Sequence, residues 1–170
     1  MELKLLDMIQ GLRNPVLDKV MPVITSLGNA GAIWILLTLL LLLIPKTRRS
    51  GWIMALALCA DVILCNGVLK NLFMRIRPCD VNQTVQLLIA RPSDFSFPSG
   101  HTAASFAAVA ALYLAEEKLL FKGALALAVL IAFSRLYLYV HYPTDVLGGM
   151  AVGIVSGYLG YWAWGKVRRK

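Results

Sequence analysis

Apolar residues form long blocks along most of this chain, without the polar residues that interrupt the amphipathic elements of a soluble domain. The clearest block, NAGAIWILLTLLLLLIP, ends at Pro45 and is followed by Lys46, Arg48 and Arg49. The five blocks cover residues 29–45, 52–69, 101–115, 123–140 and 143–165. Because about 20 apolar residues in a helix cross a bilayer, they predict membrane-spanning helices. We expect the first to borrow residues from Val23 onward and the third to continue toward Phe121.

The N-terminal residues have a different pattern. Leucine and isoleucine recur near helical spacing in residues 2–12, with charges between them, which predicts an amphipathic helix at the membrane interface. Asn14-Pro15 breaks this helix, and a second short helix is expected over about 15–26. The sequence thus predicts a single membrane domain. It comprises an amphipathic segment (1–26), a transmembrane bundle (27–165) and a basic tail (166–170).

Composition supports this all-α integral membrane fold, a compact bundle of about five to six transmembrane helices. Hydrophobic residues make up 59% of the chain and charged residues only 15%, whereas roughly a quarter of an average soluble domain is charged. The formal net charge of +8 does not indicate nucleic-acid binding, because the cations collect at the ends of apolar blocks. The three cysteines, Cys59, Cys65 and Cys79, show no metal-binding spacing.

The loop cations predict an orientation in the cell membrane. One side of the bundle carries Lys46, Arg48, Arg49, Lys118, Lys122 and the basic tail. By the positive-inside rule this side is cytoplasmic. The other side, with the long polar loop 76–97 and the turn at 140–143, is then extracytoplasmic.

Three polar segments interrupt the apolar pattern and carry the candidate chemistry. They are KNLFMRIRP at residues 70–78, PSGH at residues 98–101 and SRLYLYVHYPTD at residues 134–145. Counting the spans places all three at the same, extracytoplasmic end of their helices. The chain has only two histidines, His101 and His141, and both lie in these segments.

The cations of these segments predict a phosphate site. Lys70, Arg77 and Arg135 supply three positive charges, and arginine suits bidentate contacts with phosphate oxygens. Lys70 and Arg77 are seven residues apart, so they share a helix face if the second helix continues that far.

The PSGH segment predicts an anion-binding helix start. Pro98 suits the first helical position, where its missing N–H costs nothing. The free N–H groups that follow then face an anion. Gly100 lets an oxygen approach the backbone, and Ser99 adds a hydroxyl donor.

His141 and Asp145 are four residues apart, but Pro143 disfavours a continuous helix through Tyr142. We therefore expect the last helix to start at Pro143, with His141 just before it. Asp145, in the first turn, can then reach back to one imidazole nitrogen of His141. That contact would orient the ring and leave the other nitrogen free to attack.

Two further features have open interpretations. Gly149, Gly153 and Gly157 recur at every fourth position of the last block. Small residues at this spacing allow close helix packing, either within the chain or at a homodimer face. Asp61, about three turns before Lys70, is expected to have a hydrogen-bonded, protonated structural role.

At the three motifs the sequence resembles the type 2 phosphatidic acid phosphatase superfamily, whose signature is KxxxxxxRP, PSGH and SRxxxxxHxxxD. Every fixed position matches. The resemblance implies that His141 attacks phosphorus, His101 is the general acid and Asp145 orients His141. Lys70, Arg77, Ser99, Gly100 and Arg135 would hold the phosphoryl oxygens. No metal or other cofactor is implied.

The resemblance is specific for the site and less so for the substrate. Among lipid phosphates we rank undecaprenyl diphosphate first, followed by phosphatidylglycerophosphate, phosphatidic acid and a lipid A phosphate. Vanadium haloperoxidases share the motifs, but five apolar blocks argue against that activity. A catalytically silent transporter or scaffold is a further alternative, disfavoured by the complete set of His101, His141 and Asp145.

Overall fold

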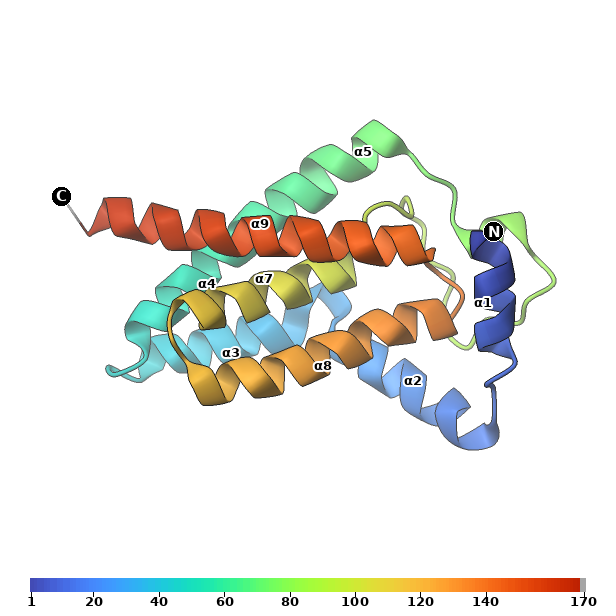
Figure 1. Cartoon of the computed structure of the whole chain (residues 1–170), viewed down its shortest axis with the longest axis horizontal. Helices are drawn as coiled ribbons and strands as arrows, with labels where there is room; N and C mark the ends of the chain where they lie inside the picture. The colour runs from blue at the N-terminus through green and yellow to red at the C-terminus, as the bar shows by residue number, and fades with distance from the viewer. Residues whose placement is uncertain (169–170) are drawn as a thin grey trace.

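A computed structural model describes residues 1–168, which form helices and no β-strands; Arg169 and Lys170 of the basic tail lie outside the described residues (Figure 1). The helices are α1 (Glu2–Gln10), α2 (Pro15–Leu27), the 3-10 helix η1 (Asn29–Gly31), α3 (Ala32–Leu43), α4 (Arg48–Asp61), the π-helix η2 (Val62–Leu69), α5 (Lys70–Phe73), α6 (Pro78–Val81), α7 (Gly100–Leu114), α8 (Lys118–Tyr137) and α9 (Pro143–Val167).

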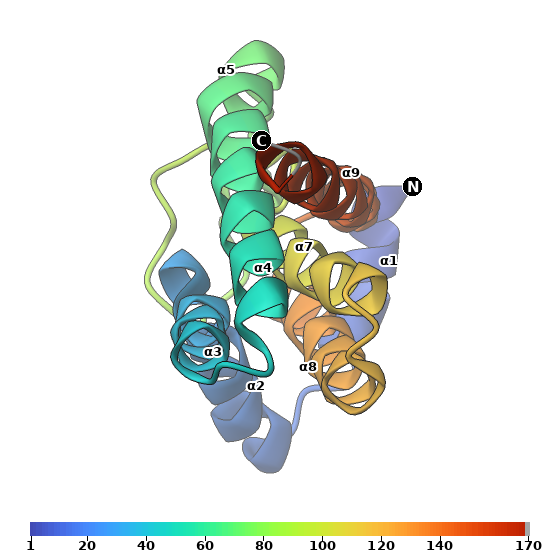
Figure 2. The ribbon, with the colours of Figure 1, turned by 90° about the vertical axis from the view of Figure 1, so that its left-hand side faces the viewer.

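Helix α7 lies at the centre of the bundle and packs against α9, α8 and α4 (Figure 2). Its sequence is rich in alanine, and Ala103, Ala107 and Ala111 are completely buried. Small side chains on every face let the neighbouring helices approach α7 closely. The short, buried α7 therefore forms the core around which the longer helices are arranged.

The glycine stripe of α9 faces α7. A Cβ atom added at Gly149 would lie 2.6 Å from the carbonyl oxygen of Ser99, and one at Gly153 would lie 2.3 Å from that of Ala103. Such distances require the backbones themselves to touch. In this structure the stripe therefore serves packing within the chain, with α7 covering it, and the predicted homodimer through it remains a prediction.

The apolar helices match the predicted spans with differences at their ends. Three helical segments are long and apolar enough to cross a membrane, and α2 with the η1–α3 segment forms a further candidate span bent by 45°. Helix α7 is a shorter apolar helix. It ends at Leu114 and does not continue toward Phe121, because Glu116 adopts a left-handed backbone (φ 67°) before α8 begins. The predicted boundary at residue 26 falls within this broken span.

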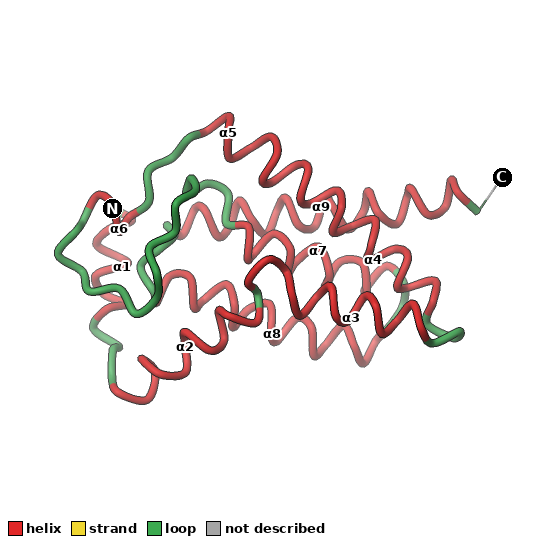
Figure 3. The backbone as a smooth tube through the Cα atoms, turned by 180° about the vertical axis from the view of Figure 1, so that it is seen from behind, coloured by secondary structure: helices red, strands yellow, loops and turns green. Residues whose placement is uncertain are grey.

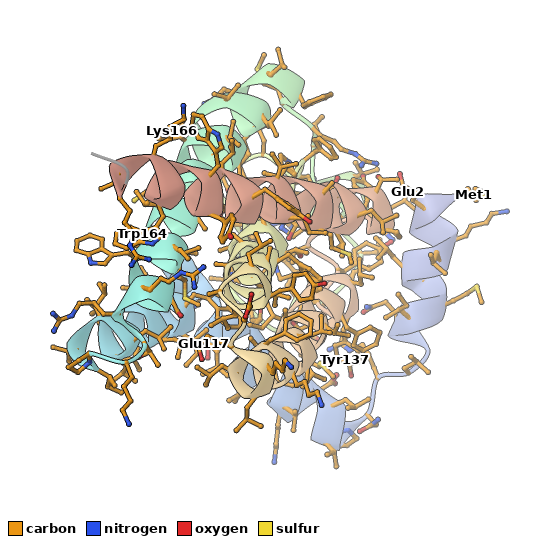
Figure 4. All side chains as sticks on the ribbon, turned by 60° about the vertical axis from the view of Figure 1, so that its left-hand side comes forward. Met1, Glu2, Glu117, Tyr137, Trp164 and Lys166 are labelled. Carbon is orange, nitrogen blue, oxygen red and sulfur yellow. The ribbon has the colours of Figure 1, made fainter. Side chains whose placement is uncertain are left out.

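The two ends of the bundle differ in chemistry. The α3–α4 turn, the α7–α8 turn and the C-terminal end of α9 lie together, at the end where Figure 4 shows Trp164 and Lys166. The long loop before α7 lies at the other end, beside α1 and the start of α9 (Figure 3). This arrangement places the predicted cytoplasmic cations at one end and the three polar motifs at the other.

Helix α1 caps the motif end of the bundle. Leu6 is fully buried against the cluster around Tyr137 and Tyr139. The Gln10 side chain donates to the carbonyl oxygen of Tyr137 (2.8 Å), and the Tyr139 hydroxyl donates to Asp7 (2.7 Å). The predicted amphipathic helix thus packs on the site end of the bundle through both its apolar and its polar side chains.

The close α7–α9 contact generates a stability prediction. We expect Gly153→Ala to lower the free energy of unfolding by about 1–3 kcal/mol, because the new methyl group would overlap the Ala103 carbonyl. Gly165→Ala in the same helix is the matched control, since its added Cβ meets nothing within 4 Å. Thermal unfolding of both variants in detergent measures the difference. Equal unfolding temperatures would contradict the packing described here.

Candidate active site

Residues from all three motifs surround one cavity of about 400 Å³ at the loop end of the bundle. Six of the eight predicted site residues line it: Lys70, Arg77, Gly100, His101, Arg135 and His141. A larger cavity of about 920 Å³ lies at the opposite end and includes Arg49, Tyr158 and Trp162 in its lining, but neither histidine. The chemistry therefore points to the smaller cavity.

Lys70 and Arg77 reach this cavity from different backbone segments. Lys70 follows the π-helix η2, a helix type that is frequent at functional sites. The helix then ends at Phe73, because Met74 adopts a left-handed conformation (φ 42°), and Arg77 lies in extended backbone before α6. The condition for a shared helix face, that the second helix continues as far as Arg77, is therefore not met. Their side chains nevertheless meet at the same carboxylate, that of Asp94.

The PSGH segment starts α7 two residues later than predicted. Ser99 is the N-cap and Gly100 the first helical residue, so Pro98 precedes the helix. Ser99 is fully buried and its hydroxyl accepts a hydrogen bond from Thr102 (3.0 Å). Ser99 does not line the cavity, whereas Gly100 does. The predicted role of the Ser99 hydroxyl in phosphate binding thus remains a prediction.

His141 is fully enclosed and held in a defined tautomer. Nη1 of Arg77 lies 3.0 Å from Nε2 of His141. A guanidinium can only donate, so Nε2 accepts and the ring proton lies on Nδ1. Burial lowers the pKa of His141 well below its usual range, and the cations Arg135, Arg77 and Lys70 lower it further. The ring is therefore neutral at pH 7, with a lone pair on Nε2.

Asp145 occupies the first turn of α9, which begins at Pro143 as predicted. Its Oδ2 accepts a hydrogen bond from the backbone N–H of Tyr142 (2.8 Å) and another from the Ser96 hydroxyl. The same oxygen lies 3.5 Å from Nδ1 of His141. The carboxylate thus lies on the side of His141 that faces away from Arg77, but at this distance Nδ1 makes no hydrogen bond within residues 1–168. The orienting role of Asp145 therefore remains a prediction.

Two polar residues of the α2–η1 region hold the other side of the cavity. His101 Nε2 lies 2.9 Å from Oδ1 of Asn29, and Arg135 Nη1 donates to the Thr25 hydroxyl (2.7 Å). Asn29 and Thr25 were not among the site residues predicted from the sequence. The only sequence feature that could have indicated them is that each is a polar residue beside an apolar block.

Asp94 is a further residue that the motifs did not indicate. Its carboxylate accepts hydrogen bonds from Lys70 Nζ and from Arg77 Nη2 (2.7 Å), and its side chain is 51% exposed. Partial burial alone would raise the pKa of Asp94, but the Lys70 hydrogen bond and the Arg77 charge outweigh burial and hold it well below its usual range. An anion of the protein itself thus bridges the two cations that would hold phosphate.

Asp61 differs from its expected hydrogen-bonded role. It is 2% exposed, and its Oδ1 has no hydrogen-bond partner among residues 1–168. It lines a second cavity of about 380 Å³, which shares Lys70, Asp94 and His101 with the first. Asp61 therefore lies closer to the candidate site than its distance along the helix indicated.

Comparisons with known proteins agree with this geometry. The family model described as the PAP2 superfamily matches residues 50–169. An undecaprenyl-diphosphatase of Sulfolobus acidocaldarius is 32% identical over 127 residues, which cover 75% of this chain and 61% of that protein.

Solved structures share the whole fold. The crystal structure of Aquifex aeolicus LpxE has a TM-score of 0.79 and 29% identity, and covers 94% of this chain and 93% of its own. That of a transmembrane PAP2-type phosphatidylglycerolphosphate phosphatase from Bacillus subtilis has a TM-score of 0.77 and 31% identity, and covers 99% and 86%.

The position of Asp94 generates a binding prediction. We expect Asp94→Asn to bind inorganic phosphate or vanadate about tenfold more tightly, a gain of roughly 1.4 kcal/mol. The reason is that the amide leaves the charges of Lys70 and Arg77 uncompensated. The matched control is Asp18→Asn, which removes a carboxylate paired with Arg13, and neither of these residues lines the cavity. Titration calorimetry in detergent measures both affinities; weaker binding by Asp94→Asn would show that Asp94 supports the anion site instead.

Proposed function

Because this chain belongs to the PAP2 superfamily, we propose that it is a multi-pass membrane phosphatase that removes phosphate from a lipid phosphate or diphosphate. Undecaprenyl diphosphate is the substrate we favour, with undecaprenyl phosphate and inorganic phosphate as products. The observation that carries the proposal is the unprotonated Nε2 of His141, which lies in a cavity lined by Lys70, Arg77 and Arg135.

The proposed reaction has two displacements at phosphorus. In the first, Nε2 of His141 forms a bond to phosphorus, the bond to the leaving oxygen breaks and His101 protonates that oxygen. In the second, His101 takes a proton from water, the water oxygen attacks the phosphohistidine and the P–N bond breaks. The three cations and the backbone at Gly100 stabilise the charge of the pentavalent transition state. No step requires a metal ion.

The position of His101 supports this division of roles. His101 lines both the cavity that contains His141 and the second cavity, which His141 does not line. A leaving group protonated by His101 would therefore extend into the second cavity. Ile35, Leu58 and Val62 line both that cavity and an adjoining apolar groove between α3 and α4. This groove provides an apolar wall for a lipid chain that enters sideways from the bilayer.

A phosphatidylglycerophosphate phosphatase, or a phosphatidic acid phosphatase, is the second candidate. The Bacillus subtilis structure described above as a phosphatidylglycerolphosphate phosphatase covers 99% of this chain. An apolar groove accepts a diacylglycerol chain as well as a prenyl chain, so the walls favour neither. A catalytically silent transporter or scaffold is disfavoured because such a protein would not require a neutral histidine beside three cations.

The catalytic test uses purified protein in detergent with a chelator present. We expect phosphate release from at least one of undecaprenyl diphosphate, phosphatidylglycerophosphate and phosphatidic acid, with the highest kcat/KM for undecaprenyl diphosphate. His141→Gln should abolish release, and His101→Ala should reduce it by about 10²–10⁴-fold, the usual contribution of a general acid. Unchanged unfolding temperatures would show that both variants fold. Full activity of His141→Gln would refute the mechanism, and a different best substrate would refute only the ranking.

We also propose that the protein lies in the cell membrane with the active site on the extracytoplasmic face, because the opposite end carries the cations at the α3–α4 and α7–α8 turns. Cys79 is buried, so the test replaces the three native cysteines and introduces Gln83→Cys or Lys46→Cys, both at exposed positions. An impermeant thiol reagent on intact cells should label Gln83→Cys only, and Lys46→Cys only after lysis. The reverse pattern would place the site in the cytoplasm.

A further inference from the structure

Arg75 lies between the two cations of the first motif but does not line the candidate active-site cavity. Its Nη1 donates to Oδ1 of Asp145 (2.6 Å) and to the Thr144 hydroxyl (2.6 Å). Its guanidinium carbon lies 3.9 Å from the centre of the Tyr142 ring. Arg75 thus touches the first turn of α9, on the far side of Asp145 from the reaction.

The two oxygens of Asp145 accept hydrogen bonds from different donors. Oδ1 accepts from Arg75, whereas Oδ2 accepts from Ser96 and the Tyr142 backbone and faces Nδ1 of His141. Rotation of the carboxylate would break contacts on both sides. The Arg75 hydrogen bond therefore helps to hold the plane of the carboxylate in the orientation that places one oxygen toward His141.

Arg75 also compensates the negative charge of the buried Asp145. Asp145 is completely buried, and a buried carboxylate without a counter-charge is strongly destabilising. His141 is neutral and cannot compensate it. Within residues 1–168, Arg75 is the one permanent cation paired with Asp145. Loss of Arg75 would leave Asp145 free to move toward other donors or toward water.

The N-terminal helix holds Arg75 in place. Glu2, at the start of α1, accepts from Arg75 Nη2 (2.6 Å) and from the backbone N–H of Thr144 (3.1 Å). Figure 4 shows Glu2 close to the first turn of α9. A single carboxylate thus connects α1, Arg75 and the helix that carries Asp145.

We propose that Arg75 is a positioning residue for the reaction proposed above: it fixes Asp145 so that Oδ2 orients His141 for attack on phosphorus. The inference rests on the proposed function. Arg75 acts through Asp145 and touches neither the cavity nor the substrate. Its loss should therefore lower kcat and leave KM nearly unchanged.

The test compares Arg75→Ala with Arg75→Lys and with the control Arg13→Ala. Arg13 is a similarly exposed arginine (24% against 30%) paired with Asp18, and it makes no contact with Asp145. We expect Arg75→Ala to lower kcat by about tenfold to hundredfold, the range found when a residue that orients a metal-ligating histidine is lost. Arg75→Lys should recover part of kcat, and Arg13→Ala should change it less than twofold.

Two readouts separate positioning from a loss of folded protein. The charges around His141 are those of Arg77, Arg135, Lys70, His101 and Asp145. Removing Arg75 makes the field at His141 more negative and raises the pKa of His141, so the acid limb of kcat/KM should move to higher pH. Millimolar guanidinium should also restore part of the activity of Arg75→Ala, whose vacated site is partly exposed, but not that of His141→Gln.

The outcomes are distinguishable. If wild-type protein releases no phosphate, or if His141→Gln is active, the proposed function fails and the role of Arg75 fails with it. If wild-type protein is active and His141→Gln is inactive, an unchanged kcat in Arg75→Ala overturns the positioning role alone. Should Arg75→Ala not fold, Arg75→Lys decides: a kcat and an acid limb identical to wild type, although a lysine cannot reproduce the separate Nη1 and Nη2 contacts to Asp145 and Glu2, would overturn the role.

Discussion

The backbone of α9 approaches α7 so closely that no side chain fits between them, and the site depends on this contact. Gly149 lies against the Ser99 carbonyl, and the backbone N–H of Ser99 donates to the carbonyl of Asp145 (3.0 Å). The start of α7 is thereby held against the start of α9. His101, at the start of α7, and His141, just before α9, line one cavity because the two helix backbones touch.

Electrostatics then determine what the enclosed groups can do. Three cations around a buried imidazole disfavour its protonation, so His141 retains the lone pair that attack requires. The same cations attract any anion, and in this structure Asp94 supplies one. A phosphate that binds must either displace this carboxylate or share Lys70 and Arg77 with it. Asp94 therefore compensates part of the positive charge of the free site, and part of the binding energy of a substrate offsets the loss of that contact.

Asp145 shows how a membrane protein can bury a carboxylate beside its reaction centre. One oxygen is satisfied by Arg75, while the other is aimed at His141 by Ser96 and the Tyr142 backbone. Arg75 in turn is held by Glu2, so the amphipathic α1 belongs to the support of the site. The helix that the sequence predicts to lie at the membrane interface thus has a second function in the fold.

The sequence by itself determined the membrane spans, the common end of the three motifs and the start of α9 at Pro143. These features follow from local properties: block hydrophobicity, alternation of span direction and the backbone restriction that proline imposes. Only the tertiary structure decided that Arg77 lies beyond the end of the helix that carries Lys70 and that Ser99 turns inward. It also decided that Asp94 and Asn29 line the cavity and that Arg75 contacts Asp145. Those positions depend on contacts between loops and helices distant in the chain, and no periodicity or spacing encodes such contacts locally.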